Sequence, residues 1–250
     1  MDRIPGPEPQ IGVGVVASFD FTRDRELWRW MPPDVTLYLT RTEPIATSDP
    51  QELVTELNVP RYLARPTKEL CMLDVRAVIY ACTACSFVGG PEGERALREK
   101  MLACGAPVAL TTAAAMTQAL AAVDARRVAV VHPYSAEVGE RLRAYLTKSG
   151  FHVVSLKGLD LSAAELPHVT YDRVADLVLA GDHPDADAVF ISCTGLPTYD
   201  LIAPAERHLG KPVITANQAT AWALLRTIPR QAVGPHQHLT QQGGFATDQP

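Results

Sequence analysis

Two cysteines, Cys82 and Cys193, stand at equivalent places in the chain and have the residue context for thiol chemistry. Each directly follows a short apolar run, and each is followed by a threonine. A thiolate is the nucleophilic form of cysteine, and backbone N–H groups, helix N-termini or a nearby cation favour its formation. A Cys-Thr pair between a strand and a helix would supply such N–H groups without a metal ion. The alternative interpretation is a pair of buried, inert cysteines, since free cysteine often packs as a small hydrophobic residue.

The other three of the five cysteines are less informative. Cys85 completes a Cys82-x-x-Cys85 motif, a spacing that also occurs in redox and zinc sites. A zinc site would need a second ligand pair at similar spacing, and the sequence has none. We therefore expect no metal site and no disulfide framework, and we interpret Cys85 as a packed residue one helical turn beyond Cys82. Cys71 and Cys104 are interpreted as structural cysteines.

Apolar runs that alternate with helix-like stretches must position these cysteines. Short continuous apolar runs separated by helices indicate βαβ units and a parallel sheet, so the expected fold class is α/β. Strands are expected at 11–17, 35–40, 77–81, 108–110, 128–131, 152–156, 188–192 and 213–215. Helices are expected at 93–104, 113–123, 136–149, 171–180 and 218–226. Ligands of such sheets bind at the carboxyl ends of the strands, which is where both cysteines fall.

The two halves of the chain repeat one arrangement of strand, Cys-Thr, helix, Gly-x-Pro-Val strand and helix. Cys82-Thr83 precedes a Gly-Ala-Pro-Val segment, and Cys193-Thr194 precedes a Gly-Lys-Pro-Val segment. Two copies of one α/β unit predict two similar, Rossmann-like lobes related by pseudo-twofold symmetry. We assign residues 1–112 and 217–240 to an N-terminal lobe, 113–216 to a C-terminal lobe and 241–250 to a flexible tail. Both thiols then converge on one cleft between the lobes.

Composition and charge argue against several classes of protein. The formal net charge is −5 and the charges are interspersed, whereas a nucleic-acid partner requires basic patches. The apolar run 11–17 has seven residues, while a membrane-spanning helix needs about 20. The first residues lack the apolar segment of a signal peptide. We therefore expect a cytoplasmic protein that binds neither nucleic acid nor membrane.

The residues around both cysteines resemble the aspartate/glutamate racemase superfamily, and most closely its maleate cis–trans isomerases and arylmalonate decarboxylases. Tyr80-Ala-Cys82-Thr-Ala-Cys-Ser86 resembles the first cysteine motif of the isomerases, and Ser192-Cys193-Thr-Gly-Leu-Pro-Thr-Tyr-Asp200 resembles the second. The segment Gly210-Lys-Pro-Val-Ile-Thr-Ala-Asn217 matches the one that follows the second motif. His132-Pro133-Tyr134 resembles an element whose tyrosine contacts a substrate carboxylate. The resemblance covers most of the chain.

The resemblance implies two lobes with the active site between them and no metal or organic cofactor. In maleate isomerases the cysteine that corresponds to Cys82 attacks the alkene as a thiolate, the bond rotates, and elimination gives fumarate. The cysteine that corresponds to Cys193 assists near the other face. The family pattern also implies a small carboxylate substrate and a homodimer. The implied substrate-binding residues of this chain are Thr83, Thr194, Tyr134, Asn217, Asp20 and Gly195.

One position departs from the family pattern and leaves the substrate open. Maleate isomerases carry an asparagine in the loop after the first strand, where this chain has Asp20. An ionised Asp20 would repel a substrate carboxylate. We expect an isomerase, with three alternatives: a racemase of an amino acid or related acid, an arylmalonate-type decarboxylase with Cys193 as proton donor, or a non-catalytic ligand-binding protein on the same scaffold. The decarboxylases have only the second-half cysteine, so the presence of both favours an isomerase or racemase.

Overall fold

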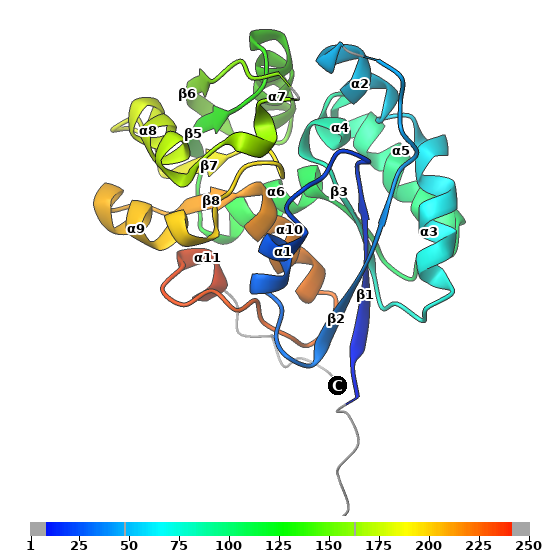
Figure 1. Ribbon diagram of the computed structural model, residues 1–250. Helices are drawn as coiled ribbons and strands as arrows, with labels where there is room; N and C mark the ends of the chain where they lie inside the picture. Colours follow the sequence, from blue (N-terminus) through cyan, green and yellow to red (C-terminus); the bar gives the residue numbers. More distant parts are fainter. Residues whose placement is uncertain (1–8, 48, 163, 242–250) are drawn as a thin grey trace, which may run out of the picture.

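The computed structural model describes residues 9–47, 49–162 and 164–241, which form two four-stranded parallel sheets flanked by helices (Figure 1). The first sheet has the order β2-β1-β3-β4 and the second has the order β6-β5-β7-β8, so the second half of the chain repeats the first strand for strand. This confirms the predicted α/β fold with two similar lobes. The strands are β1 (Ile11–Ala17), β2 (Val35–Arg41), β3 (Val78–Ala81), β4 (Ala109–Thr111), β5 (Arg127–His132), β6 (His152–Gly158), β7 (Ala188–Ile191) and β8 (Val213–Thr215).

The strands lie at the predicted apolar runs because the sheets are covered on both faces. The central strands β3 and β7 are buried along their whole length, so every position requires an apolar side chain and no polar alternation appears. Each central strand pairs in parallel with the first strand of its own lobe. The carboxyl ends of β3 and β7 are therefore fixed in the middle of their sheets. Cys82 follows β3 directly, and Cys193 follows β7 after Ser192.

Helices fill the connections between the strands. The predicted helices are present as α5 (Gly90–Ala103), α6 (Thr112–Ala122), α7 (Ala136–Lys148), α8 (Tyr171–Gly181) and α10 (Ala216–Leu225). The sequence interpretation missed α1 (Asp24–Arg29), α2 (Pro50–Glu56), α3 (Ala64–Cys71), α4 (Thr83–Phe87), α9 (Tyr199–Leu209), α11 (His238–Gln241) and the 3₁₀ turns η1 (Pro60–Leu63) and η2 (Leu166–His168). Most of these are too short to show a helical period, and α9 contains Pro204, which usually breaks a helix.

Helices α6 and α10 pack against each other between the two sheets (Figure 1). Each follows the last strand of one sheet, and each has a threonine N-cap whose side chain accepts a backbone N–H of the first turn. The hydroxyls of Thr112 and Thr220 lie 2.8 Å apart across the contact. In addition, α10 contacts β3 of the first sheet and α6 contacts β8 of the second. The lobe boundaries at 112/113 and 216/217 stay a prediction.

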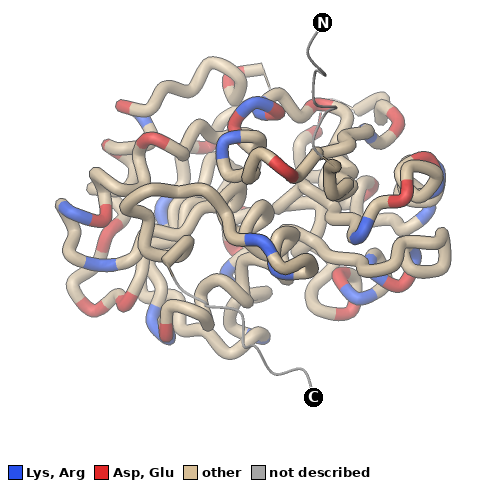
Figure 2. Tube along the Cα trace, turned by 90° about the horizontal axis from the view of Figure 1, so that it is seen from below, with Lys and Arg blue, Asp and Glu red and all other residues tan. Residues whose placement is uncertain are grey.

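The lobes share one hydrophobic core. Its buried side chains come from both sheets, as Ile79 and Phe190 illustrate, and from α6 and α10. Acidic and basic residues are mixed over the described trace, without a continuous basic stretch (Figure 2). Within the described residues, no helix has the length and apolar character needed to cross a membrane. Of the predicted tail 241–250, only Gln241 lies within the described residues, where it ends α11.

Candidate active site

A cavity of about 250 Å³ lies where loops from both lobes meet at the carboxyl ends of the strands. Seven of the eight predicted site residues line it, and Asn217 does not. The loops that follow β1, β3, β5, β6 and β7 contribute, and α2 closes one side with apolar side chains. The lining includes Asp20, Cys82, Thr83, Tyr134, Cys193, Thr194 and Gly195, together with Phe21, Leu53, Val54, Leu57, Val138, Asp160, Leu161 and Leu166.

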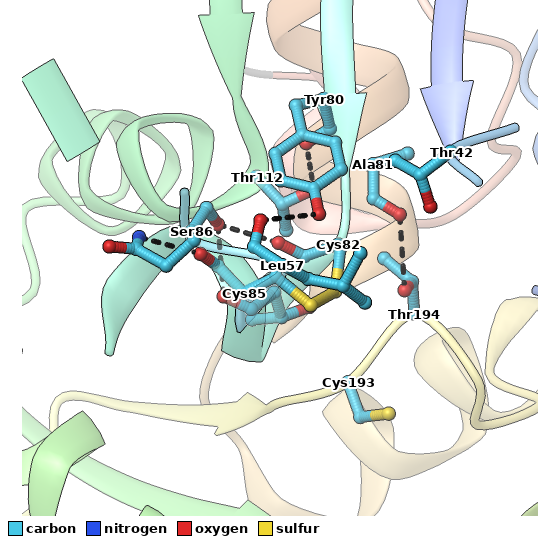
Figure 3. Close-up of a disulfide and its surroundings, with 12 residues drawn as sticks. Thr42, Leu57, Tyr80, Ala81, Cys82, Cys85, Ser86, Thr112, Cys193 and Thr194 are labelled. Carbon is cyan, nitrogen blue, oxygen red and sulfur yellow. Dashed lines mark hydrogen bonds between the residues drawn. A yellow bond between two sulfur atoms is a disulfide. The ribbon is translucent and has the colours of Figure 1, made fainter. Parts of the chain in front are cut away.

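Cys82 directly follows β3 and is the N-cap residue of α4, in an extended backbone conformation. Its sulfur is bonded to that of Cys85, which lies one helical turn further on (Figure 3). The interpretation of Cys85 as a merely packed residue was therefore wrong. Spacing alone did not reveal the bond, because a Cys-x-x-Cys motif is compatible with free, metal-bound or disulfide sulfurs. Ser86 fixes the turn by donating its hydroxyl to Cys82 O (2.6 Å) and Thr83 O (2.9 Å).

Cys193 follows β7 after one intervening residue, Ser192, and carries a free, buried thiol. Its φ of 99° is a left-handed conformation that a residue with a Cβ rarely adopts. The contacts of the surrounding loop must therefore offset the backbone strain at Cys193. Burial raises the pKa of Cys193 to about 11, and the charge of Asp20 acts in the same direction. The backbone N–H of Gly195, which lies 3.3 Å from the sulfur, and the hydroxyl of Tyr134 partly offset this rise in pKa. Near neutral pH the group is a thiol.

Tyr134 lies in the loop after β5 and contacts residues of both lobes at the cavity. Its hydroxyl lies 3.2 Å from the Ser192 hydroxyl, one residue before Cys193. Its ring packs edge-on against Phe87 of α4 and stacks on His132. Burial and the neighbouring Cys193 raise the pKa of Tyr134 well above its ordinary value, so it remains a neutral hydrogen-bond donor.

The threonines after the two cysteines occupy different environments. Thr194 donates its hydroxyl to Ala81 O at 3.5 Å, and so links the second cysteine loop to the end of β3 (Figure 3). Thr83 Oγ1 is buried and has no hydrogen-bond partner among the described residues. A buried hydroxyl without a partner is costly, and Thr83 is among the residues that line the cavity.

Asn217 is fully buried behind the loop that carries Cys193. Its Nδ2 donates to Thr194 O (3.1 Å) and Leu196 O (3.4 Å), so in the structure it holds the loop. Gly195 lines the cavity, and a Cβ at this position would lie 2.6 Å from Leu166 Cδ2 and 3.4 Å from Cys193 Sγ. A larger residue here would therefore displace the Leu166 side chain, whereas its contact with the Cys193 sulfur would be an ordinary one.

Two acidic residues matter here that sequence reasoning overlooked. Asp160, with a φ of 52°, lines the cavity in the loop after β6. Glu26 of α1 is buried, and its Oε1 accepts Thr198 N (2.7 Å), Thr198 Oγ1 (2.5 Å) and Tyr199 N (3.1 Å). Burial raises the pKa of Glu26, and the hydrogen bonds from Thr198 and Tyr199 counteract the rise. Glu26 thereby ties α1 to the start of α9, directly after the loop that carries Cys193.

The lining residues differ in charge from what a dicarboxylate site would need. Asp20 and Asp160 are the charged side chains among the lining residues that the structure describes, and no lysine or arginine is among them. The hydrogen-bond donors along the wall are backbone N–H groups and neutral hydroxyls, among them those of Thr83 and Tyr134. Within the described residues, no three His, Cys, Asp or Glu side chains gather as a metal site. The absence of a cofactor stays a prediction.

Comparisons with known proteins decide the family. The sequence profile of the arylmalonate decarboxylase family matches residues 59–238. The chain belongs to this family. It is 33% identical to a maleate isomerase of Nocardia farcinica over 174 residues, which are 64% of this chain and 69% of the relative. It is 31% identical to the arylmalonate decarboxylase of Bordetella bronchiseptica over 147 residues, or 58% and 61% of the two chains.

Solved structures of the family extend the likeness to the whole fold. One is a mutant of Nocardia farcinica maleate cis–trans isomerase with a covalently bound succinylcysteine intermediate. It superposes with a TM-score of 0.81 at 26% identity, and the match covers 93% of this chain and 99% of that one. A liganded double mutant of arylmalonate decarboxylase superposes with a TM-score of 0.82 at 25% identity, covering 92% and 98%. These relatives confirm the predicted superfamily, the two-lobed fold and the prediction that the protein is an enzyme with cysteine-based chemistry.

Proposed function

We propose that the protein is a cofactor-independent isomerase of a small unsaturated carboxylate, with Cys82 as nucleophile and Cys193 as proton donor. The observation that carries the proposal is the placement of both cysteines on one cavity, each within two residues of the carboxyl end of an inner strand of its own sheet. Figure 3 shows Cys193 on the second lobe opposite the pair formed by Cys82 and Cys85. A substrate in the cavity would then meet one sulfur from each lobe.

The proposed reaction starts from reduced Cys82. Its thiolate adds to one carbon of the double bond, and the π electrons move onto the neighbouring carbon and its carboxylate. The remaining C–C single bond rotates, the electron pair returns, and the C–S bond breaks to restore the thiolate. No atom is gained or lost. Cys193, whose pKa is raised to about 11, remains a thiol near neutral pH and can stabilise the negative charge by hydrogen bonding or proton donation.

The lining residues favour a substrate with a single carboxylate. The donors at Thr83, Tyr134 and the Gly195 loop suit one carboxylate, whereas Asp20 and Asp160 disfavour a second negative charge. The apolar wall from α2 and the loop after β6 suits an uncharged or apolar end of the substrate. Maleate, from which the Nocardia farcinica relative takes its name, remains the first compound to test, and its monoamide is the natural comparison.

Proton NMR in deuterated buffer tests this proposal with protein reduced by dithiothreitol. We expect cis–trans conversion of the monoamide of maleate, slower conversion of maleate, and loss of both in Cys82→Ala and Cys193→Ala. Asp20→Asn should raise the rate with maleate relative to the monoamide, because it removes the repulsive charge. Conversion that persists in Cys82→Ala, or no conversion of either compound by the reduced protein, would contradict the proposed function.

A second candidate is decarboxylation of a substituted malonate. It is supported by the family match and by the bond between Cys82 and Cys85, which leaves Cys193 as the free thiol of the cavity. A thiol with a raised pKa suits protonation of a carbanion from one side. This candidate predicts carbon dioxide release from a phenylmalonate that survives in Cys82→Ala and is lost in Cys193→Ala, the opposite dependence on Cys82.

The assembly and the location of the protein remain predictions. A homodimer is expected from the superfamily, and light scattering coupled to size-exclusion chromatography would measure it. A cytoplasmic location is likewise expected, and fractionation of cells of the source organism would test it.

A further inference from the structure

We propose that Cys85 is a resolving cysteine, which converts the nucleophile Cys82 reversibly into a disulfide and so makes the active site sensitive to hydroperoxides and dithiols. The loss of activity on oxidation rests on the proposed function, because it requires Cys82 to be the nucleophile. The sulfur chemistry itself does not depend on which substrate the enzyme converts.

The backbone places the two sulfurs in reach of each other. Their Cα atoms are 5.5 Å apart, inside the range of about 4.4–6.8 Å in which disulfides form. Cys82 is the N-cap residue of α4 and Cys85 lies within its first turn, so both side chains leave the helix on the same side. A bond between them therefore requires no rearrangement of the sheet or of the neighbouring helices.

Hydrogen bonds hold this turn independently of the sulfur bond. Ser86 Oγ donates to the carbonyls of Cys82 and Thr83 and accepts the backbone N–H of Ala113 at 3.1 Å. Asn58 Nδ2 donates to Cys85 O at 2.8 Å. Because these contacts involve backbone groups and other side chains, they can persist when the two sulfurs are thiols. The same frame then accommodates the reduced and the oxidised form.

Access to the pair runs through the substrate cavity. Both cysteines line it, yet they are only 8% and 2% exposed. A small oxidant such as hydrogen peroxide can enter by this route, and a bound substrate would block it. The other cysteine of the cavity, Cys193, is free, and Cys71 and Cys104 are not among the residues that line the cavity.

The chemistry balances with a hydroperoxide and a dithiol. The Cys82 thiolate attacks a peroxide oxygen, the O–O bond breaks, and Cys82 becomes a sulfenic acid while water leaves after protonation. The Cys85 thiol then attacks the sulfenic sulfur, an S–S bond forms and a second water leaves. In total two thiols and one hydrogen peroxide give one disulfide and two waters. A dithiol reverses the bond by thiol–disulfide exchange and is itself oxidised to a disulfide.

Peptide mass spectrometry tests the proposal on the full-length protein. The reduced protein is treated with one equivalent of hydrogen peroxide, alkylated with iodoacetamide and digested with trypsin. We expect peptide 77–95, which holds both cysteines, to lose the mass of two hydrogen atoms and to escape alkylation, and dithiothreitol to restore both alkylation sites. Substrate present before the peroxide should slow the change.

Matched variants separate the possible outcomes. In Cys85→Ser we expect no disulfide, and Cys82 should instead gain oxygen atoms; the double variant Cys71→Ser/Cys104→Ser should behave as the unmodified chain. Alkylation of both cysteines after peroxide, or a bond from Cys82 to Cys193 instead, would overturn the proposal. If the disulfide forms and is reversed while the reduced protein converts no unsaturated carboxylate, the proposed function fails and the resolving role of Cys85 stands.

Discussion

The thiol of Cys193 should titrate far above an ordinary cysteine, and this can be measured without knowing the substrate. Burial, together with the charge of Asp20, raises its pKa from 9.0 to about 11. At pH 8 a thiol of pKa 9.0 is about 9% thiolate and one of pKa 11 is about 0.1%, roughly a 90-fold difference. Cys193 is therefore suited to give a proton rather than to attack as a nucleophile.

The assay is the rate of alkylation by iodoacetamide as a function of pH. It uses a variant in which the other four cysteines are replaced by serine, so that only Cys193 reacts. In the folded protein the rate should rise about tenfold per pH unit from pH 7 to beyond pH 10, because only the thiolate reacts. In the same variant unfolded in urea the curve should have its midpoint near pH 9 and level off above it. The midpoint of the curve reports the pKa, whereas limited access lowers the whole curve.

Two substitutions should move the midpoint in opposite directions. Asp20→Asn removes a charge that raises the pKa of Cys193, so the midpoint should fall. Tyr134→Phe removes a hydroxyl that lowers this pKa, so the midpoint should rise. Burial is the largest cause, and neither variant should return the thiol to its ordinary value. A midpoint at or below pH 9 in the folded protein would refute the assignment of Cys193 as proton donor.

Three further predictions concern the residues around the site. Burial lowers the pKa of His132 to about 4, so the folded protein keeps this imidazole neutral while the unfolded chain takes up a proton below pH 6.5. Between pH 7 and pH 5 the free energy of unfolding in urea should therefore fall by about 2 kcal/mol more than it does in His132→Gln. Glu26→Ala leaves Thr198 and Tyr199 without their acceptor, and its free energy of unfolding should fall by about 3 kcal/mol, with Glu26→Gln losing less. Gly195→Ala places a Cβ against Leu166, and kcat/KM should fall about tenfold while the melting temperature changes little.

The sequence predicted the positions of the two cysteines because their positions follow from local patterns. Short apolar runs mark strands buried on both faces, and β1 and β8 have the predicted bounds. Parallel strands place their carboxyl ends at one edge, so Cys82 and Cys193, one and two residues after β3 and β7, had to lie on the ligand-binding side of their sheets. The repeat of this pattern predicted the second lobe from the first.

The contacts that the sequence did not reveal depend on side-chain direction or on long-range pairing. Glu26 accepts hydrogen bonds from residues more than 170 positions away, and no local pattern indicates that. Asn217 was expected to bind substrate, yet its amide points to the backbone of the Cys193 loop, because the first turn of α10 packs directly behind that loop. Asp160 follows a strand end that carries no recognisable motif. The bond between Cys82 and Cys85 required the geometry of α4.

The central claim, that reduced Cys82 attacks the substrate, is tested most directly by trapping its covalent adduct. Dithiothreitol-reduced Cys193→Ala protein is mixed with maleate or its monoamide, quenched in acid and digested, and peptide 77–95 is fragmented to separate Cys82 from Cys85. We predict an added mass of one substrate molecule on Cys82, absent in protein unfolded before mixing. An adduct on Cys85, or turnover of the Cys82→Ala protein without any adduct, would contradict the account.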